Sequence, residues 1–567
     1  MEKIKGREIL LEMLVNEGVD TVFCPLSSRE TDFLCFIPEK YRDKIKFVKA
    51  RHEQAAAHMA DGYARATGRP GVLITLPGPY GINTVTGLTT AHMDSAPIIC
   101  IVADLDPWNT DTGDTFISDH IGITQSCTKH NYLVKKTSDI TKTIREAIHV
   151  AKTGRPGPVL VDIPFKVLAG EEKFTLPKLD IRGYKEVKKG DPAQVKRAVE
   201  MILKSKRPVI FGGGGLIISG ATDELVKFAH AYKIPVTNTL MGIGSYPTDD
   251  PFYVNWIGMH GAYNANMAVH ESDLVISIGA RFDDRATGGN FEKFAPKAKI
   301  IHIDIDPSTI DKNIVVHCPI IGDAKAVLKQ MLEIIPSDFE VDRSDWIKKI
   351  RDWDQEHPMS YSQQGSKIKT TYVIDKISEI TNGEAIVAAD VGQHQMWLAQ
   401  FYRFKNPRAH ITSGGLGTMG FGLPAAIGAK FGRPDNQVIC VCGDGSFQMN
   451  MQEIATAVEN EMDLKIIVLN NRHHGMVRQW QTLFFNSNYS SSYFEVLPDF
   501  VKIAKSYGAS GFHITKPEEV EPSLKEGLTM KGVVLIEIEV DYEEMVYPML
   551  TPGGDMSDMI VQPSDLA

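Results

Sequence analysis

The fold is decided by Val438-Ile-Cys-Val-Cys-Gly443-Asp444-Gly445-Ser446 together with Lys465-Ile-Ile-Val-Leu-Asn470-Asn471 further along the chain. Each stretch begins with a short apolar run typical of a buried strand, and a helical pattern at 448–461 separates the two. This order predicts a right-handed β-α-β crossover, which brings the carboxyl ends of both strands to one edge of a parallel sheet. We therefore expect Asp444 and Asn471 to meet at that edge.

The polar groups at this edge suit a magnesium ion. Mg²⁺ takes oxygen ligands, keeps few of them from protein, and accepts the rest from phosphate and water. We predict three ligands: the carboxylate of Asp444, the side-chain amide oxygen of Asn471 and the backbone carbonyl of His473.

The turn between the strand and the helix suits a diphosphate. Gly443 and Gly445 would let the chain approach it closely, and a helix beginning at Ser446 would favour its negative charge. A simpler interpretation is that Gly-Asp-Gly is an ordinary turn and Asn-Asn an ordinary strand end. Their joint occurrence, one helix and one strand apart, favours the cofactor site.

The same alternation of strands and helices runs through the whole chain. We expect strands at 21–24, 46–50, 72–76, 98–103, 159–163, 208–211, 274–278, 299–303, 437–442 and 465–469. Such alternation indicates parallel sheets covered by helices. Two irregular stretches, 171–192 and 336–369, are interpreted as linkers, the second with a short helix. The predicted fold class is α/β, with three doubly wound parallel-sheet domains at about 1–170, 190–335 and 370–567.

Composition excludes several classes of protein. The formal net charge of −10 argues against a nucleic-acid or anionic-membrane partner. Seven cysteines without a C-x-x-C pair fit reduced thiols and exclude a disulfide framework. The first residues have no apolar signal core, and no apolar run approaches the length of a membrane span. We expect a soluble cytoplasmic protein.

Glu53 is the candidate catalytic residue of the first domain. It follows the strand 46–50 and opens a helical pattern at 55–66, so the simpler interpretation is a carboxylate that complements the helix dipole. With the predicted metal site downstream, we favour a proton-handling role at a bound cofactor.

Nearly the whole chain resembles the large catalytic subunit of acetohydroxyacid synthase, also called acetolactate synthase. The matching stretches include RHEQAAAHMADGYARATGRPGV (51–72), GRPGPVLVDIP (154–164), GMHG (258–261), ARFDDR (280–285), HIDIDP (302–307), DVGQHQMW (390–397), ITSGGLGTMGFGLPAAIGA (411–429), GDGSFQMN (443–450), GMVRQWQ (475–481) and VYPML (546–550). The resemblance implies thiamine diphosphate as the cofactor, with three domains that bind its pyrimidine, FAD and its diphosphate.

The resemblance also implies roles for individual residues around thiamine diphosphate. Glu53 would hydrogen-bond the aminopyrimidine ring and help to activate the cofactor. Gln393 and His394 would lie near the diphosphate. Gly417 and Met419, from a glycine-rich loop that could otherwise be simple packing, would contact the pyrimidine, and Met419 would hold the cofactor in its bent shape.

FAD is expected in the middle domain on the same grounds. The family pattern points to Arg155, Gly213, Gly214, Thr239, Leu240, Gly258, His260, Gly279, Arg281, Asp304 and Asp323. A run of glycines after a strand is common by itself, so this expectation rests on the GMHG, ARFDDR and HIDIDP matches.

The substrate pocket both matches and departs from the family. Arg285 would hold a 2-oxo acid carboxylate by paired hydrogen bonds, Trp480 would shape the acceptor pocket, and Phe116, Met259 and Val477 would line it. Structurally, Arg285 could instead be a surface ion pair and Trp480 a core aromatic. The departures are Ser28, Arg29, Ile117 and Phe165, where the family has small residues, a Gln and a Lys. Arg29 should meet a carboxylate of the protein or of a substrate, because a buried unpaired Arg is costly.

Three hypotheses remain open. The first is a carboligase that decarboxylates pyruvate or a related 2-oxo acid and transfers the remaining unit to a second carbonyl. The second is a thiamine-diphosphate decarboxylase or carboligase for a larger or more anionic substrate that Arg29 would bind. The third is a degenerate cofactor-binding or regulatory subunit, which the presence of Glu53, Asp444 and Asn471 disfavours. The resemblance implies a homodimer or homotetramer with shared sites, and a small regulatory subunit is a further partner to test.

Overall fold

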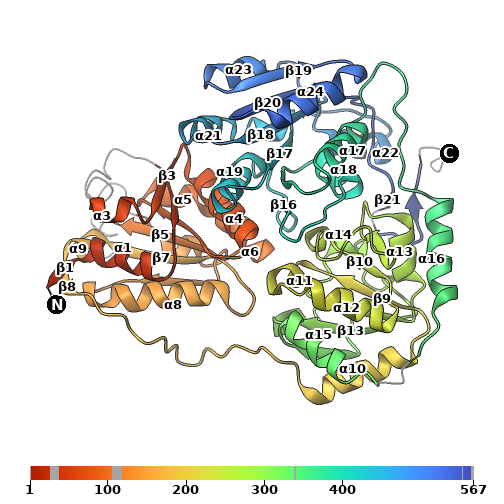
Figure 1. Ribbon diagram of the computed structural model, residues 1–567, viewed down its shortest axis with the longest axis horizontal. Coiled ribbons are helices and arrows are strands. Elements are labelled where there is room, and N and C mark those ends of the chain that lie inside the picture. The colour runs from red at the N-terminus through yellow and green to blue at the C-terminus, as the bar shows by residue number, and fades with distance from the viewer. Residues whose placement is uncertain (1, 26–37, 105–117, 337–339, 552, 563–567) are drawn as a thin grey trace.

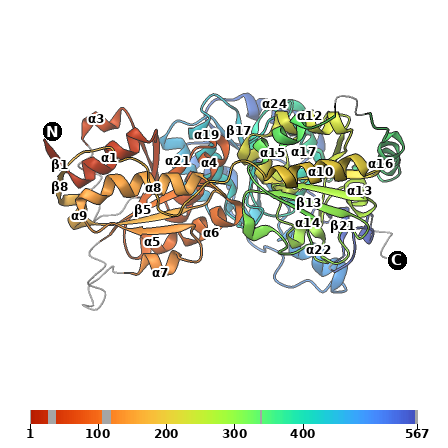
Figure 2. The ribbon, with the colours of Figure 1, turned by 90° about the horizontal axis from the view of Figure 1, so that it is seen from below.

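Three parallel sheets of six strands each form the framework of the protein in a computed structural model (Figures 1 and 2). The structure describes residues 2–25, 38–104, 118–336, 340–551 and 553–562. Figure 1 shows the first sheet at the left, the middle sheet at the lower right and the last sheet across the top. The predicted α/β fold class is confirmed.

The first sheet runs in the order β3 (Lys46–Ala50), β2 (Thr21–Pro25), β4 (Gly71–Thr75), β5 (Ile98–Asp104), β7 (Val159–Pro164) and β6 (His130–Leu133). Its helices are α1 (Gly6–Asn16), α3 (Glu39–Arg42), α4 (Glu53–Thr67), α5 (Pro79–Asn83), α6 (Val85–Asp94), α7 (His120–Thr124), α8 (Ile140–Lys152) and α9 (Phe165–Ala169). A small antiparallel pair, β1 (Lys3–Lys5) and β8 (Glu171–Lys173), joins the two ends of this domain.

The middle sheet runs in the order β11 (Tyr253–Trp256), β10 (Val236–Asn238), β9 (Pro208–Gly212), β12 (Leu274–Ile278), β13 (Lys299–Asp304) and β14 (Cys318–Ile321). Its helices are α10 (Pro192–Lys204), α11 (Gly214–Ser219), α12 (Thr222–Tyr232), α13 (Tyr263–His270), α14 (Asp284–Thr287), α15 (Ala324–Glu333) and α16 (Ser344–Glu356). The helix expected in the second linker is α16, and it packs on the middle core through Trp346 and Ile350.

The last sheet runs in the order β16 (His410–Thr412), β15 (Ile386–Ala389), β17 (Val438–Gly443), β18 (Leu464–Asn470), β20 (Val533–Glu539) and β19 (Ser510–Ile514). Its helices are α17 (Thr370–Ile380), α18 (Gln393–Phe401), α19 (Gly422–Gly432), α20 (Asp444–Phe447), α21 (Ile454–Glu459), α22 (Gly475–Phe484), α23 (Phe500–Ser506) and α24 (Pro517–Thr529). The final pair, β21 (Met549–Leu550) and β22 (Met559–Ile560), lies against the middle domain, where Leu550 is buried in its core.

Alternate residues of each strand enter different cores, because successive side chains point to opposite faces of a sheet. In β17, Cys440 and Cys442 face a core shared with the first domain, while Ile439 and Val441 face the core that contains α17 and α24. Both faces of the sheet are therefore covered. Every strand predicted from the sequence is present, and its ends differ by no more than one residue.

The helix predicted at 448–461 is wrong in its extent. The chain forms only the short α20, a turn of 3₁₀-helix at Met451–Glu453 and α21. Asn450 lies between these pieces with a non-helical φ of −140°, and its buried side chain donates to the backbone oxygen of Gly420 at 2.7 Å. The helix after β17 also begins at Asp444 and not at Ser446.

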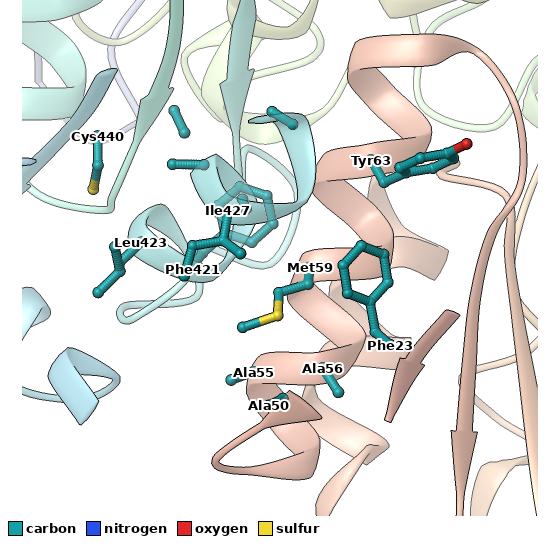
Figure 3. Packing of buried hydrophobic residues seen from close by; sticks show 14 of the residues in the cluster. Phe23, Ala50, Ala55, Ala56, Met59, Tyr63, Phe421, Leu423, Ile427 and Cys440 are labelled. Atoms are coloured by element: carbon teal, nitrogen blue, oxygen red, sulfur yellow. The ribbon is translucent and has the colours of Figure 1, made fainter. Parts of the chain in front are cut away.

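The first and last domains are joined by a close crossing of α4 and α19 (Figure 3). Glycine allows the approach: a Cβ on Gly62 would lie 2.1 Å from the oxygen of Ala425, and one on Gly428 would lie 1.8 Å from the oxygen of Met59. Figure 3 shows Met59 of α4 on the side of its helix that faces Phe421, the residue before α19, and Ile427 of α19. Among the described residues, no helix is long and apolar enough to cross a membrane.

Candidate active site

A cavity of about 760 Å³ is lined by residues of all three domains, most of them from the middle and last domains. It opens at the carboxyl ends of β17 and β18, where Asp444 and Asn471 follow strands that pair at Gly443 and Leu469. The predicted meeting of these two residues at one sheet edge is therefore present in the fold.

One of the predicted metal ligands, Asp444, has an unpaired buried oxygen. Asp444 is 1% exposed, and its Oδ2 has no hydrogen-bond partner within the described part of the chain. Burial raises the pKa of this carboxyl to about 7, although backbone N–H groups of Gly445 and Arg472 oppose the rise. Asn471 Oδ1 accepts from the N–H of His473 at 2.9 Å, which fixes the amide at the cavity wall. An unpaired carboxylate oxygen beside an amide oxygen fits a hard divalent cation such as Mg²⁺.

Two side chains at the start of α18 face the same space. Gln393 Nε2 donates to Gln479 Oε1 at 2.9 Å, which leaves Gln393 Oε1 buried without a partner among the described residues. His394 Nε2 is unpartnered in the same way, and burial lowers the pKa of His394 to about 4, so the ring is neutral. Buried unpaired polar atoms of this kind are costly unless a ligand meets them.

Gly443, Gly445 and Ser446 line the cavity beside Asp444. A Cβ on Gly443 would lie 3.2 Å from His394 Nδ1. Only glycine leaves this wall free of a side chain, which fits a bulky anionic group close to the backbone.

The loop between β16 and α19 forms another wall, with Gly417 and Met419 on the cavity surface. Gly417 has a φ of +72°, a conformation that favours glycine. Asp390 follows β15 and accepts the backbone N–H groups of Gly420 and Gly422, both at 2.9 Å. Sequence reasoning missed Asp390, although an acid directly after a buried strand is the same signal that identified Asp444.

Nine of the eleven residues expected to bind FAD line the same cavity. They are Arg155, Gly214, Thr239, Leu240, His260, Gly279, Arg281, Asp304 and Asp323. Burial raises the pKa of Asp304 to about 6 and lowers that of His260 to about 4. Two further expected residues do not line the cavity: a Cβ on Gly213 would meet the backbone of Gly279 at 2.1 Å, and Gly258 donates its N–H to Asn266 Oδ1 at 3.0 Å.

The expected substrate residues are only partly brought together. Met259, Arg285, Val477 and Trp480 line the cavity. Arg285 Nη1 lies 3.3 Å from the sulfur of Met259, and its side chain is 64% exposed, so the guanidinium is open to a ligand. The same exposure is compatible with a surface ion pair to Asp284, whose carboxylate lies 3.6 Å from Arg285 Nε.

Of the remaining predicted substrate residues, only Phe165 belongs to the part of the chain that the structure describes. Phe165 packs against the core of the first domain and is not among the described residues that line the cavity. Ser28, Arg29, Phe116 and Ile117 lie outside the described residues.

Glu53 is also absent from the lining residues of this one chain. It is 6% exposed at the start of α4, and its Oε2 accepts from Asn83 Nδ2 at 2.9 Å. The turn before it is tied to the last domain, because Glu453 accepts the backbone N–H of Arg51 at 3.0 Å.

The chain is similar to known proteins over nearly its whole length. The chain matches the family descriptions "Thiamine pyrophosphate enzyme, N-terminal TPP binding domain" over residues 4–123, "central domain" over 195–331 and "C-terminal TPP binding domain" over 390–538. It is 42% identical over 569 residues to the acetolactate synthase large subunit of Haemophilus influenzae, covering 99% of each chain. It is 41% identical over 570 residues to the isozyme 3 large subunit of Escherichia coli, covering 99% of each. The probable acetolactate synthase large subunit of Methanocaldococcus jannaschii is 43% identical over 571 residues, which is 99% of this chain and 95% of that protein.

Proposed function

Since this chain belongs to the acetolactate synthase large-subunit family of thiamine-diphosphate enzymes, we propose that it decarboxylates pyruvate and joins the remaining two-carbon unit to the carbonyl of a second 2-oxo acid. The observation that carries the proposal is a cavity whose described lining includes both the pair Asp444 and Asn471 and the pair Arg285 and Trp480.

Asp444, Asn471 and the carbonyl of His473 would hold Mg²⁺, and the metal would hold the diphosphate. Gln393 and His394 would meet the diphosphate with polar atoms that are otherwise unpaired. When bound, thiamine diphosphate supplies the electron sink that allows a 2-oxo acid to lose CO₂.

Arg285 would bind the substrate carboxylate through paired charge-assisted hydrogen bonds. Its exposed guanidinium beside Met259 supports this role. Trp480 and Val477, both on α22, would shape the space for the acceptor. Their apolar surfaces would limit the access of water and so favour addition of the transferred unit to a carbonyl over its protonation.

FAD would occupy the middle-domain half of the cavity. Arg155 and Arg281 offer positive charge to its phosphates, and the buried carboxyl of Asp304 suits a hydroxyl donor. Gly214 and Gly279 leave the backbone open to a close approach.

Glu53 would act from a second copy of the chain. A buried acid that does not line its own chain's cavity supports a site completed across a homodimer or homotetramer. Because the relatives are named large subunits, we also propose a smaller regulatory partner. Cys100, Cys127, Cys318, Cys440 and Cys442 are free thiols, which supports a reducing compartment such as the cytoplasm.

The test is an assay of purified protein with pyruvate, thiamine diphosphate, Mg²⁺ and FAD, with products identified by mass spectrometry. Acetolactate is the expected product, and omission of Mg²⁺ should abolish it. A parallel screen of larger and dicarboxylic 2-oxo acids provides the comparison. If those acids are consumed and pyruvate is not, the pyruvate assignment is wrong. Absence of CO₂ release from every 2-oxo acid would dismiss an enzymatic role.

A further inference from the structure

The carboxyl end of α6 in the first domain is bonded to the cavity loop of the last domain. Asp94 accepts the backbone N–H of Gly415 through Oδ1 at 2.7 Å and that of Gly414 through Oδ2 at 3.1 Å. One turn earlier, Thr90 Oγ1 lies 2.7 Å from Thr418 Oγ1, and both side chains are buried. These contacts cross between domains within one chain.

Arg65 of α4 completes the junction. Its Nη2 donates to Asp94 at 3.0 Å, and its Nη1 donates to the backbone oxygen of Thr412 at 2.7 Å. Its Nε and Nη2 also pair with Asp61, which lies one turn earlier on the same helix. The loop is therefore bonded at 412, 414, 415 and 418, on both sides of the cavity residue Gly417 and just before Met419.

Arg65 alone does not balance the negative charges of Asp61 and Asp94, so Asp94 depends on its hydrogen bonds with the loop. One guanidinium faces two carboxylates, and the Asp61 and Asp94 side chains are both 0% exposed. The excess negative charge on Asp94 is met by the N–H groups of Gly414 and Gly415, because a buried carboxylate needs donors on its oxygens. A displaced loop would leave Asp94 without two of its donors.

The glycine at 415 fits the same explanation. A Cβ there would lie 2.7 Å from Asp94 Oδ1, closer than a side chain tolerates. The close approach of Asp94 therefore explains why residue 415 is a glycine, in addition to the contact that this glycine-rich loop would make with a cofactor.

We propose that Asp94, supported by Arg65 and Thr90, is a positioning residue that holds the 412–418 loop so that Gly417 and Met419 present a preformed surface to thiamine diphosphate. This inference rests on the proposed function for the identity of the ligand. It assigns the first domain a further contribution to the site within the same chain, separate from those of Glu53 and Arg155.

The chain offers matched controls for a test. Asp94→Asn removes the charge that the loop amides meet. Asp61→Asn removes the other carboxylate that pairs with Arg65; this carboxylate is equally buried but, among the described residues, bonds to Arg65 and not to the loop. Thr90→Val removes the hydroxyl that reaches Thr418, whereas Thr89→Val removes a neighbouring hydroxyl that bonds Val85 within α6 at 2.7 Å.

The test consists of two measurements: the rate of hydrogen exchange of the peptide 411–421 in the cofactor-free protein, and the Kd for thiamine diphosphate at saturating Mg²⁺. Asp94→Asn should raise both by about tenfold, the effect of losing roughly one charge-assisted hydrogen bond. Thr90→Val should raise both by about threefold, as expected for a neutral bond. Asp61→Asn and Thr89→Val should leave both within twofold of wild type.

Equal effects of Asp94→Asn and Asp61→Asn would overturn the proposal and leave a purely structural ion pair. If Asp94→Asn does not fold, the comparison of Thr90→Val with Thr89→Val decides alone, and equal values for that pair reject the proposal. A wild-type protein that binds no thiamine diphosphate would refute the proposed function, while exchange in the cofactor-free protein would still decide whether Asp94 holds the loop.

Discussion

Replacing Asp444 with Asn should stabilise the cofactor-free chain at pH 8 while abolishing Mg²⁺ binding. The carboxyl is 1% exposed, and Oδ2 has no partner among the described residues. Burial is the largest cause that raises the pKa of Asp444 from 3.8 to about 7. Ionisation of this carboxyl, which the metal requires, therefore lowers the stability of the cofactor-free protein.

The pH dependence follows from the difference between folded and unfolded chains. The carboxyl ionises near pH 3.8 when unfolded and near 7 when folded, so the folded chain binds an extra proton between these values. The contribution of Asp444 to stability is complete below about pH 3.8 and is lost as the pH rises through about 7. One pKa unit corresponds to about 1.4 kcal/mol, so the loss amounts to about 4 kcal/mol. Asn has nearly the same size and does not ionise, so the free energy of unfolding of Asp444→Asn should not fall in this way as the pH rises.

The assay is thermal unfolding of both proteins in EDTA between about pH 4 and pH 8, together with calorimetric titration of Mg²⁺ and thiamine diphosphate at pH 8. If the last domain unfolds as a unit, Asp444→Asn should melt about 10 °C above wild type at pH 8, with the gap closing towards pH 4. The exposed Asp435→Asn is the control and should show no such gap. Equal melting temperatures at pH 8, or retained Mg²⁺ affinity in Asp444→Asn, would refute the reasoning.

Three further outcomes are expected. Glu53→Gln keeps a side-chain oxygen that can accept from Asn83 but removes the proton-handling carboxyl group. We therefore expect kcat to fall by about 10²–10⁴, with little change in the Kd for the cofactor. Activity within threefold of wild type would contradict the assignment. Gly428→Ala adds a methyl group 1.8 Å from the oxygen of Met59 and should lower the free energy of unfolding by about 1–3 kcal/mol. Gly157→Ala is the control, because its methyl group would lie 3.4 Å from the nearest atom. Thiamine diphosphate with Mg²⁺ at 100 times Kd should stabilise the chain by about 2.7 kcal/mol, and EDTA should reverse the gain; a melting temperature unchanged by EDTA would argue against a metal-held cofactor.

Some features of the site could be predicted because they depend on local pattern. Buried parallel strands are near-continuous apolar runs, so β17 and β18 were identified to within a residue. The crossover rule then brings Asp444 and Asn471 together from sequence order alone. Strands as short as β10 (Val236–Asn238) and β16 (His410–Thr412) have too few residues for a periodic signal.

The amino-acid sequence by itself determined the three α/β units, the acid and amide at one sheet edge, and the family resemblance. Only the tertiary structure decided that Asn450 interrupts the helix after β17, that Glu53 lies away from its own chain's cavity, and that Asp94 bonds the loop before Met419. The reason is physical: periodicity and crossover handedness act over a few consecutive residues. Hydrogen bonds such as that of Asp94 to Gly415 join residues hundreds of positions apart, which come together only when separate domains pack.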